Sequence, residues 1–104
     1  MSTQTPRITG PTLKVLGQLM TAPLSGLSGA EISKATSISS GTLYPILIRL
    51  EKAGWLSSEW EEVNPCEVGR PRKRFYQLTS VGAQESRAVF DDLFPTGGQL
   101  VWQS

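Results

Sequence analysis

The chain has 104 residues, of which 38% are hydrophobic and 18% are charged, and its formal net charge is +1. This size and composition predict one small globular domain rather than a disordered chain. Because there is no histidine and only one cysteine, the chain cannot build a Ser-His-Asp triad or an ordinary zinc site of Cys and His ligands, so an enzyme is disfavoured and no metal or cofactor is expected.

Residues 1–10 are polar and contain Pro6 and Gly10, so they are predicted to form a flexible arm. This segment lacks the apolar stretch of a secretory signal, and no part of the chain approaches the ~20 apolar residues that span a membrane. The lone Cys66 cannot form an internal disulfide. Together these features favour a cytoplasmic protein without a membrane partner.

Two short helices are predicted next, at about 11–21 and 29–36. Pro11 suits the first turn of the former, where its missing N–H costs no hydrogen bond. Ser28 and Glu31 have the spacing of a capping box at the start of the latter. Helical spacing of apolar residues predicts that both helices pack into a core. The expected core residues are Leu13, Leu16, Leu19, Met20, Ile32 and Ala35.

A third helix is predicted at about 40–53, between a cap at Ser39 or Ser40 and a terminating Gly54. One face carries an apolar stripe of Leu43, Ile46, Leu47 and Leu50. At about 100° per residue, the opposite face carries Gly41, Thr42, Pro45, Ile48, Arg49 and Lys52, with Tyr44 on a flank. This helix is therefore expected to bury one side and to leave a polar side open to a partner.

The pattern then changes to that of a strand hairpin. Residues 55–63 place Leu56 and Trp60 on one face, as in a half-buried strand, and residues 72–78 form the returning strand. The loop between them, about eight residues long, is rich in Pro, Gly and Asn, which favour turns.

A last helix is predicted at about 80–94, capped by Thr79. Its apolar band comprises Val81, Val89, Phe90, Leu93 and Phe94. The band can pack into the chain's own core, but it is wide for so small a domain. We therefore expect a homodimer interface formed by Val89, Phe90, Leu93 and Phe94.

This order of elements predicts a mainly α fold with a small β hairpin. A two-stranded hairpin is not stable alone, so it is expected to pack as a wing beside a helix-turn-helix formed by the second and third helices. The predicted parts are the arm at 1–10, a winged helix-turn-helix DNA-binding domain at 11–79, and a C-terminal dimerisation helix and tail at 80–104. In this architecture the third helix can enter the major groove while the wing meets phosphate or the minor groove.

Two segments resemble signatures of the PadR-type transcriptional regulators. Residues 41–55, GTLYPILIRLEKAGW, are similar to the recognition helix of that family. Residues 69–79, GRPRKRFYQLT, followed by Gly82, are similar to its wing and second strand. The resemblance implies a dimeric winged-helix DNA-binding regulator, often a repressor that a small phenolic or drug-like compound releases. The short C-terminal part is similar to the short subfamily, whose single C-terminal helix makes the dimer.

The candidate DNA-binding residues lie at the start and on the polar side of the third helix, and in a basic run in which residues 68–74 carry four cations and no acid. They are Ser39, Ser40, Thr42, Tyr44, Pro45, Arg49, Arg70, Arg72, Lys73 and Arg74. We expect Ser39 and Ser40 both to cap the helix and to touch phosphate.

Each candidate has an alternative role. The wing cations can instead be solvated, or paired across the hairpin with Glu59, Glu61 and Glu62. DNA contact is favoured for Arg70 and Arg72 at the edge of the loop, and both roles stay open for Arg74. The alternative for Thr42, Tyr44 and Pro45 is capping and packing, and Trp55 and Trp60 are expected to pack rather than to bind a ligand.

These features together predict a sequence-specific transcriptional regulator that represses as a homodimer on a pseudo-palindromic operator in double-stranded DNA. The PadR-type resemblance further implies release by a small aromatic effector. Some short family members bind flat aromatic ligands at a Trp-lined dimer pore, but Trp102 lies in an irregular tail, so that role is not assigned to it. Two alternatives stay open, and the near-zero net charge supports the first of them. One is a winged-helix protein–protein interaction module, and the other is a small-molecule-sensing dimer with little DNA binding.

Overall fold

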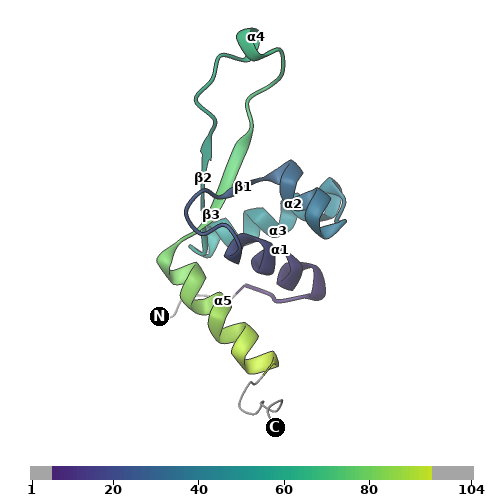
Figure 1. The fold of residues 1–104 in the computed structure, drawn as a ribbon. Helices are drawn as coiled ribbons and strands as arrows, with labels where there is room; N and C mark the ends of the chain where they lie inside the picture. Colours follow the sequence, from purple (N-terminus) through teal and green to yellow (C-terminus); the bar gives the residue numbers. More distant parts are fainter. Residues whose placement is uncertain (1–5, 95–104) are drawn as a thin grey trace.

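The structure of the chain, a computed structural model, describes residues 6–94. Its elements are α1 (Gly10–Met20), β1 (Leu27–Ser28), α2 (Gly29–Thr36), α3 (Ser40–Lys52), β2 (Leu56–Trp60), α4 (Pro65–Val68), β3 (Arg74–Leu78) and α5 (Ser80–Leu93). Helices α1, α2 and α3 pack together beside the sheet, β2 and β3 project away from them as a long hairpin, and α5 extends in the opposite direction (Figure 1). The predicted mainly α fold with a wing is confirmed.

Side-chain caps determine where the first two helices begin. Thr9 accepts a hydrogen bond from the Thr12 amide at 3.3 Å, which satisfies one of the free N–H groups at the start of α1. Ser28 Oγ accepts from the Glu31 amide at 3.1 Å, and Glu31 Oε1 accepts from the Ser28 amide at 2.8 Å. The predicted capping box of α2 is therefore confirmed.

The core lies where α1, α2 and α3 meet the sheet. Its buried side chains are Val15, Leu16, Leu19, Ile32, Ile38, Leu43, Ile46, Leu47, Leu50, Trp55, Leu56 and Tyr76. The apolar stripe predicted for the third helix is thus confirmed, while Leu13 and Met20 are only half-buried. The prediction for Ala35 was wrong, because Ile32 and Thr36, one turn apart, form the inward side of α2 and leave Ala35 exposed.

The sheet has three strands rather than the two of the predicted hairpin. Its order is β1-β3-β2 and both pairings are antiparallel. Strand β1, which was expected to be only a turn-rich link, places Leu27 opposite Tyr76 and Ser28 opposite Phe75. This third strand fixes the base of the hairpin to the start of α2.

The wing is longer and more ordered than predicted. Strand β2 ends at Trp60 and β3 begins at Arg74, so the loop spans residues 61–73. At its tip, α4 forms because the Asn64 side chain accepts a hydrogen bond at 2.9 Å from the amide two residues later, and Pro65 occupies the first helical turn. Figure 1 shows α4 at the far end of the hairpin.

The expectation that Trp60 packs like Leu56 was wrong. The two side chains fall on one side of β2 by alternation, yet Leu56 is 3% exposed and Trp60 is 55% exposed. The hairpin extends beyond the helices, so Trp60 lies outside the core. The guanidinium of Arg74, which is opposite Trp60 in the sheet, lies 5.0 Å from the centroid of its ring.

Helix α5 is attached to the domain at its first turn, and apolar side chains at its last turn are exposed. The Thr79 hydroxyl accepts a hydrogen bond from the Gly82 amide at 2.9 Å, as predicted for its cap. Only part of the predicted apolar band reaches the core. Val89 and Phe90 pack against it, whereas Val81 is 51%, Leu93 50% and Phe94 61% exposed.

The two ends of the chain are described only in part. Residues 1–5 of the predicted arm and residues 95–104 of the predicted tail, which include Trp102, lie outside the described residues. In the described part of the arm, Ile8 packs against the core and Thr9 caps α1.

Replacing Ser28 with alanine is expected to lower the free energy of unfolding by about 1 kcal/mol, because the change removes the capping box of α2. Urea denaturation would measure it. The matched control is Ser39→Ala, since Ser39 is the N-cap residue of α3 but makes no side-chain cap hydrogen bond. Equal losses for both variants would contradict a specific role for the Ser28 cap.

Candidate nucleic-acid interface

One side of α3 is buried in the core and the other side faces solvent. Thr42, Pro45, Arg49 and Lys52 are exposed, and Ile48 is 51% exposed. In the described residues neither Arg49 nor Lys52 forms an ion pair. The open side therefore presents two unpaired cations, a hydroxyl and apolar surface, which suit phosphate, base edges and thymine methyl groups respectively.

The first turn of α3 exposes two serine hydroxyls. The Ser39 carbonyl accepts hydrogen bonds from the amides of Thr42 at 3.1 Å and Leu43 at 2.8 Å. Within residues 6–94 the hydroxyls of Ser39 and Ser40 make no hydrogen bond, so the expectation that the Ser39 side chain caps the helix was wrong. Both hydroxyls are instead open to an external acceptor or donor.

Tyr44 links α3 to the start of α2. A Cβ atom added at Gly29 would lie 2.5 Å from Tyr44 Oη and 3.0 Å from its Cζ, so the ring rests directly on the α2 backbone. The side chain is nevertheless 42% exposed. Tyr44 therefore sets the spacing of the two helices of the helix-turn-helix and still has surface available to a partner.

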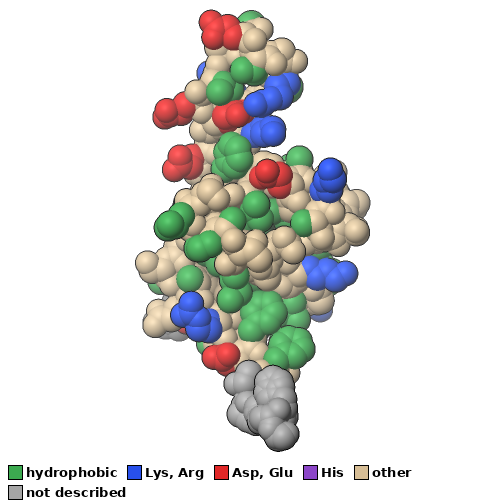
Figure 2. All heavy atoms as spheres, in the orientation of Figure 1, with side chains coloured by type: hydrophobic (Ala, Val, Ile, Leu, Met, Phe, Trp, Pro, Cys, Tyr) green, Lys and Arg blue, Asp and Glu red, His purple; other side chains and the backbone are tan. Residues whose placement is uncertain are grey.

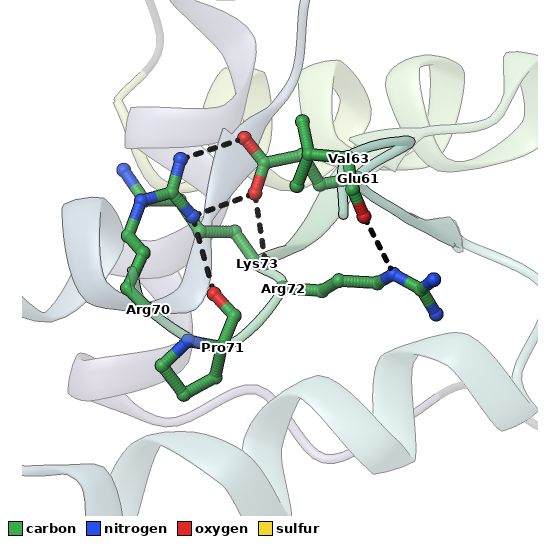
Figure 3. Close-up of polar contacts among 6 residues, drawn as sticks. All are labelled: Glu61, Val63, Arg70, Pro71, Arg72 and Lys73. Carbon is green, nitrogen blue, oxygen red and sulfur yellow. Dashed lines mark hydrogen bonds and ion pairs between the residues drawn. The ribbon is translucent and has the colours of Figure 1, made fainter. Parts of the chain in front are cut away.

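Arg70 lies against Glu61 across the wing loop. Its Nη1 donates to Glu61 Oε1 at 2.7 Å and its Nη2 donates to Oε2 at 3.0 Å, while Nη1 also reaches the Pro71 carbonyl at 3.1 Å (Figure 3). The hydrogen bonds from Arg70 and from the Lys73 amide lower the pKa of Glu61 to about 2, and the pKa of Arg70 is raised by the same pair. Arg70, which the sequence favoured as a DNA contact, is thus paired with Glu61 inside the loop.

The side chains of Arg72 and Lys73 have fewer partners within the protein than that of Arg70. Arg72 Nε donates to the Val63 carbonyl at 3.0 Å, and its two other guanidinium nitrogens point away from the residues drawn around it (Figure 3). Lys73 uses its backbone, since its amide donates to Glu61 Oε1 at 3.1 Å and its carbonyl accepts from the Glu61 amide at 2.8 Å. Both residues are exposed, and in the described residues neither side chain has a salt-bridge partner.

Arg74 connects the wing to α3. Its Nε donates to Ser58 Oγ at 3.1 Å, and Ser58 Oγ donates to Glu51 Oε2 at 2.7 Å. Its Nη2 lies 3.8 Å from the same Glu51 oxygen, and its guanidinium stacks on Trp60. The sequence interpretation considered only strand glutamates as partners, and it missed Glu51 and Ser58.

The charges of the wing are separated by side. Figure 2 shows acidic side chains mainly along one edge of the projecting hairpin and cationic side chains along the other. A near-neutral chain can therefore still present a basic edge to a polyanion.

A family comparison decides the class of this winged helix. The model of the transcriptional regulator PadR-like family matches residues 16–88. The chain belongs to this family. The match covers the second half of α1, then α2, α3, the whole wing and α5 as far as residue 88, so the PadR-like resemblance predicted from the recognition helix and the wing is confirmed.

Solved structures of similar fold are winged-helix regulators. A MepR Q18P mutant from a multidrug-resistant S. aureus clinical isolate has a TM-score of 0.73 and 22% identity, with 93% of this chain and 66% of that chain covered. The S. aureus MepR–DNA complex has a TM-score of 0.67 and 22% identity, with 86% and 70% covered. AbfR of Staphylococcus epidermidis has a TM-score of 0.67 and 27% identity, with 88% and 59% covered. The MepR likeness concerns the fold, and no curated protein matches the chain.

The PadR-like chain has an apolar groove at the exposed end of α5. Phe90 and Phe94 stack there with ring centroids 6.1 Å apart and an interplanar angle of 21°. The groove is lined by Leu13, Lys14, Gly17, Gln18, Ala35, Thr36, Phe90 and Phe94. Figure 2 shows hydrophobic side chains gathered at this end of the molecule. Two of the four residues predicted to form the dimer interface thus line a groove with α1 and α2.

Other kinds of site have no counterpart in the part of the PadR-like chain that the structure describes. Over residues 6–94, no three His, Cys, Asp or Glu side chains come together as a metal site would require. None of the helices in this range combines the length and the hydrophobicity needed to cross a membrane.

The pKa of the Glu61 carboxyl group in this PadR-like wing is expected to be about 2, well below its ordinary value of 4.5, when followed by NMR. Because its folded pKa is below its unfolded value, the pair with Arg70 is fully present above about pH 4.5 and is lost as the pH falls toward 2. Arg70→Met should raise the Glu61 midpoint toward 4.5. A Glu61 midpoint near 4.5 in the wild type would contradict the pair.

Proposed function

We propose that this PadR-like regulator binds a specific sequence of double-stranded DNA as a homodimer and represses transcription from a pseudo-palindromic operator. The observation that carries the proposal is the combination of an open polar side on α3 with unpaired wing cations at Arg72 and Lys73. The helix offers groups for base edges, and the wing offers charge for phosphate. The S. aureus MepR chain that shares this fold was solved as a DNA complex, which supports the same use of the fold.

The proposed contacts fall into two groups. Residues free for direct contact are Ser39, Ser40, Thr42, Pro45, Arg49, Arg72 and Lys73. Tyr44, Arg70 and Arg74 also have partners inside the protein, so any DNA contact they make shares the side chain with a structural role. Removing one cation that neutralises a phosphate should lower the salt dependence of binding by about one unit in a log–log plot.

Selection of bound sites from random duplexes tests the proposal. We expect a pseudo-palindrome whose half-sites lie about one helical turn, ~34 Å, apart. Binding to the selected duplex should weaken steeply with added salt. A chain that binds no duplex at low salt would overturn the proposal and favour the protein-interaction alternative.

The homodimer part of the proposal rests on the open end of α5. Leu93 and Phe94 are at least half exposed next to the Phe90 groove, which leaves apolar surface for a second copy. Light scattering at micromolar concentration should give twice the chain mass. Phe94→Glu should give the monomer, and Val81→Glu, at a similarly exposed position on the first turn of the same helix, should keep the dimer. A monomeric wild-type chain would overturn the dimer.

A small aromatic effector is the last part of the proposal. The groove is lined in part by the rings of Phe90 and Phe94 and by Leu13, which suit stacking of a flat aromatic compound. A MepR structure of the same fold was solved with ethidium bromide bound. Ethidium titrated into the chain should change its fluorescence, and Phe90→Ala should remove that change. An unchanged response in Phe90→Ala would place any ethidium site elsewhere.

A further inference from the structure

The wing loop is tied together by one carboxylate. Glu61 accepts hydrogen bonds from Arg70 Nη1 at 2.7 Å, Arg70 Nη2 at 3.0 Å and the Lys73 amide at 3.1 Å (Figure 3). Its own amide donates to the Lys73 carbonyl at 2.8 Å. The Glu61 side chain is only 18% exposed, although it lies on a projecting hairpin. Glu61 thus connects the two arms of the loop, the outgoing arm at residues 61–63 and the returning arm at residues 71–73.

No strand pairing holds the loop beyond this point. The ladder between β2 and β3 ends at the pair of Trp60 and Arg74. The α4 turn at the tip is closed by local hydrogen bonds that Asn64 and Pro65 accept from the following amides, and these bonds do not reach the returning arm at residues 71–73. The position of Arg72 and Lys73 relative to the strands therefore depends on Glu61 and on the single Arg72 bond to the opposite arm.

We propose that Glu61 is a positioning residue of the DNA interface, an acid that strengthens binding to a polyanion by holding Arg72 and Lys73 in place, with Arg70 as its structural partner rather than a phosphate contact. This inference rests on the proposed DNA-binding function. It reassigns the role of Arg70 and adds an acidic residue that charge alone would exclude from such an interface.

Simple electrostatics predicts the opposite effect. A carboxylate near phosphate repels it, so neutralising an acid on a DNA-binding wing should tighten binding. If Arg70 contacted phosphate directly, removing Glu61 would also release Arg70 for that contact. In our proposal, removal of the Glu61 carboxylate leaves residues 71–73 held only by the backbone bond from the residue 61 amide to Lys73 and by the Arg72 bond to Val63. This looser hold makes Arg72 and Lys73 bind phosphate more weakly. The two views therefore differ in the sign of one measurement.

The test compares Glu61→Gln with Glu62→Gln on the duplex selected by the wild-type chain. Both variants remove one negative charge from adjacent positions, but Glu62 is exposed and forms no salt bridge in the described residues. Glu61→Gln should weaken binding about tenfold and lower the salt slope by about one to two units for each wing, because Arg72 and Lys73 then neutralise fewer phosphates. Glu62→Gln should bind as tightly as the wild type or more tightly.

Two further measurements separate positioning from general stability. Without DNA, the Lys73 amide should exchange faster in Glu61→Gln than in the wild type, while the melting temperature stays within about 2 °C because the loop is exposed. The double variant Glu61→Gln/Arg70→Met should lose less affinity than the sum of the two single losses, since both changes break the same Arg70–Glu61 pair.

The outcomes distinguish this inference from the function on which it rests. Tighter binding by Glu61→Gln, or a Lys73 amide that exchanges at the wild-type rate, would overturn the inference and leave DNA binding intact. A wild-type chain that binds no duplex would overturn both.

Discussion

Replacing Gly82 with alanine is expected to lower the free energy of unfolding by about 3 kcal/mol, because a side chain at this position collides with backbone. A Cβ atom there would overlap the Trp55 carbonyl oxygen and lie 2.7 Å from its carbonyl carbon. The start of α5 cannot move away easily. The Thr79 amide donates to the same Trp55 carbonyl at 2.9 Å, and the Thr79 hydroxyl donates to the Gly54 carbonyl at 2.6 Å. Relief of the collision therefore breaks the hydrogen bonds that attach α5.

Urea denaturation of Gly82→Ala and Gly10→Ala would measure this effect. A Cβ atom at Gly10, the first residue of α1, meets nothing within 4 Å. The control should therefore unfold within about 0.5 kcal/mol of the wild type, as exposed positions usually do. If Gly82→Ala were as stable as Gly10→Ala, α5 would have to lie farther from Trp55 than the structure places it.

Removing both free wing cations, as Arg72→Ala/Lys73→Ala, is expected to weaken DNA binding on the order of a hundredfold at low salt. In the proposed dimer each wing then neutralises two fewer phosphates, and the salt slope should fall by about one unit for each of them. Because phosphate contacts carry little sequence information, the preference among duplexes should change little. Titrations of labelled duplex at several salt concentrations would give both quantities.

The control for this variant removes the same charge elsewhere. Arg7→Ala/Arg87→Ala takes two exposed cations from the segment before α1 and from α5, and neither residue lines the Phe90 groove or lies on α3 or the wing. It should leave the salt slope close to that of the wild type, with light scattering to check that the oligomeric state is unchanged. Equal affinity of the wing variant and the wild type would show that the wing does not touch DNA.

The elements that the sequence predicted correctly are those with local signals. The capping box of Ser28 and Glu31, the cap at Thr79 and the apolar stripe of α3 each depend on residues within a few positions of one another. Such signals act before any tertiary contact forms. Strand β1 was missed because two residues are too short to show an alternating pattern.

The partners of the wing cations depended on geometry that the sequence does not show. The α4 turn lengthens the loop and brings Arg70 back to Glu61, nine positions earlier in the chain. Arg74 finds Glu51 and Ser58 because β2 turns back along α3. Charge patterns identified the right segment, but they could not tell which cations are engaged within the protein.

The bridge from Arg74 through Ser58 to Glu51 joins the wing strands to the last turn of α3. This bridge thus couples the base of the wing to the helix that is proposed to enter the major groove. The distance between α3 and the wing then limits which DNA geometries can contact both. Groove width varies with base sequence, so the affinity for a duplex can depend on base pairs that no side chain contacts. An operator could accordingly be favoured for its shape at base pairs that lie between the helix and the wing.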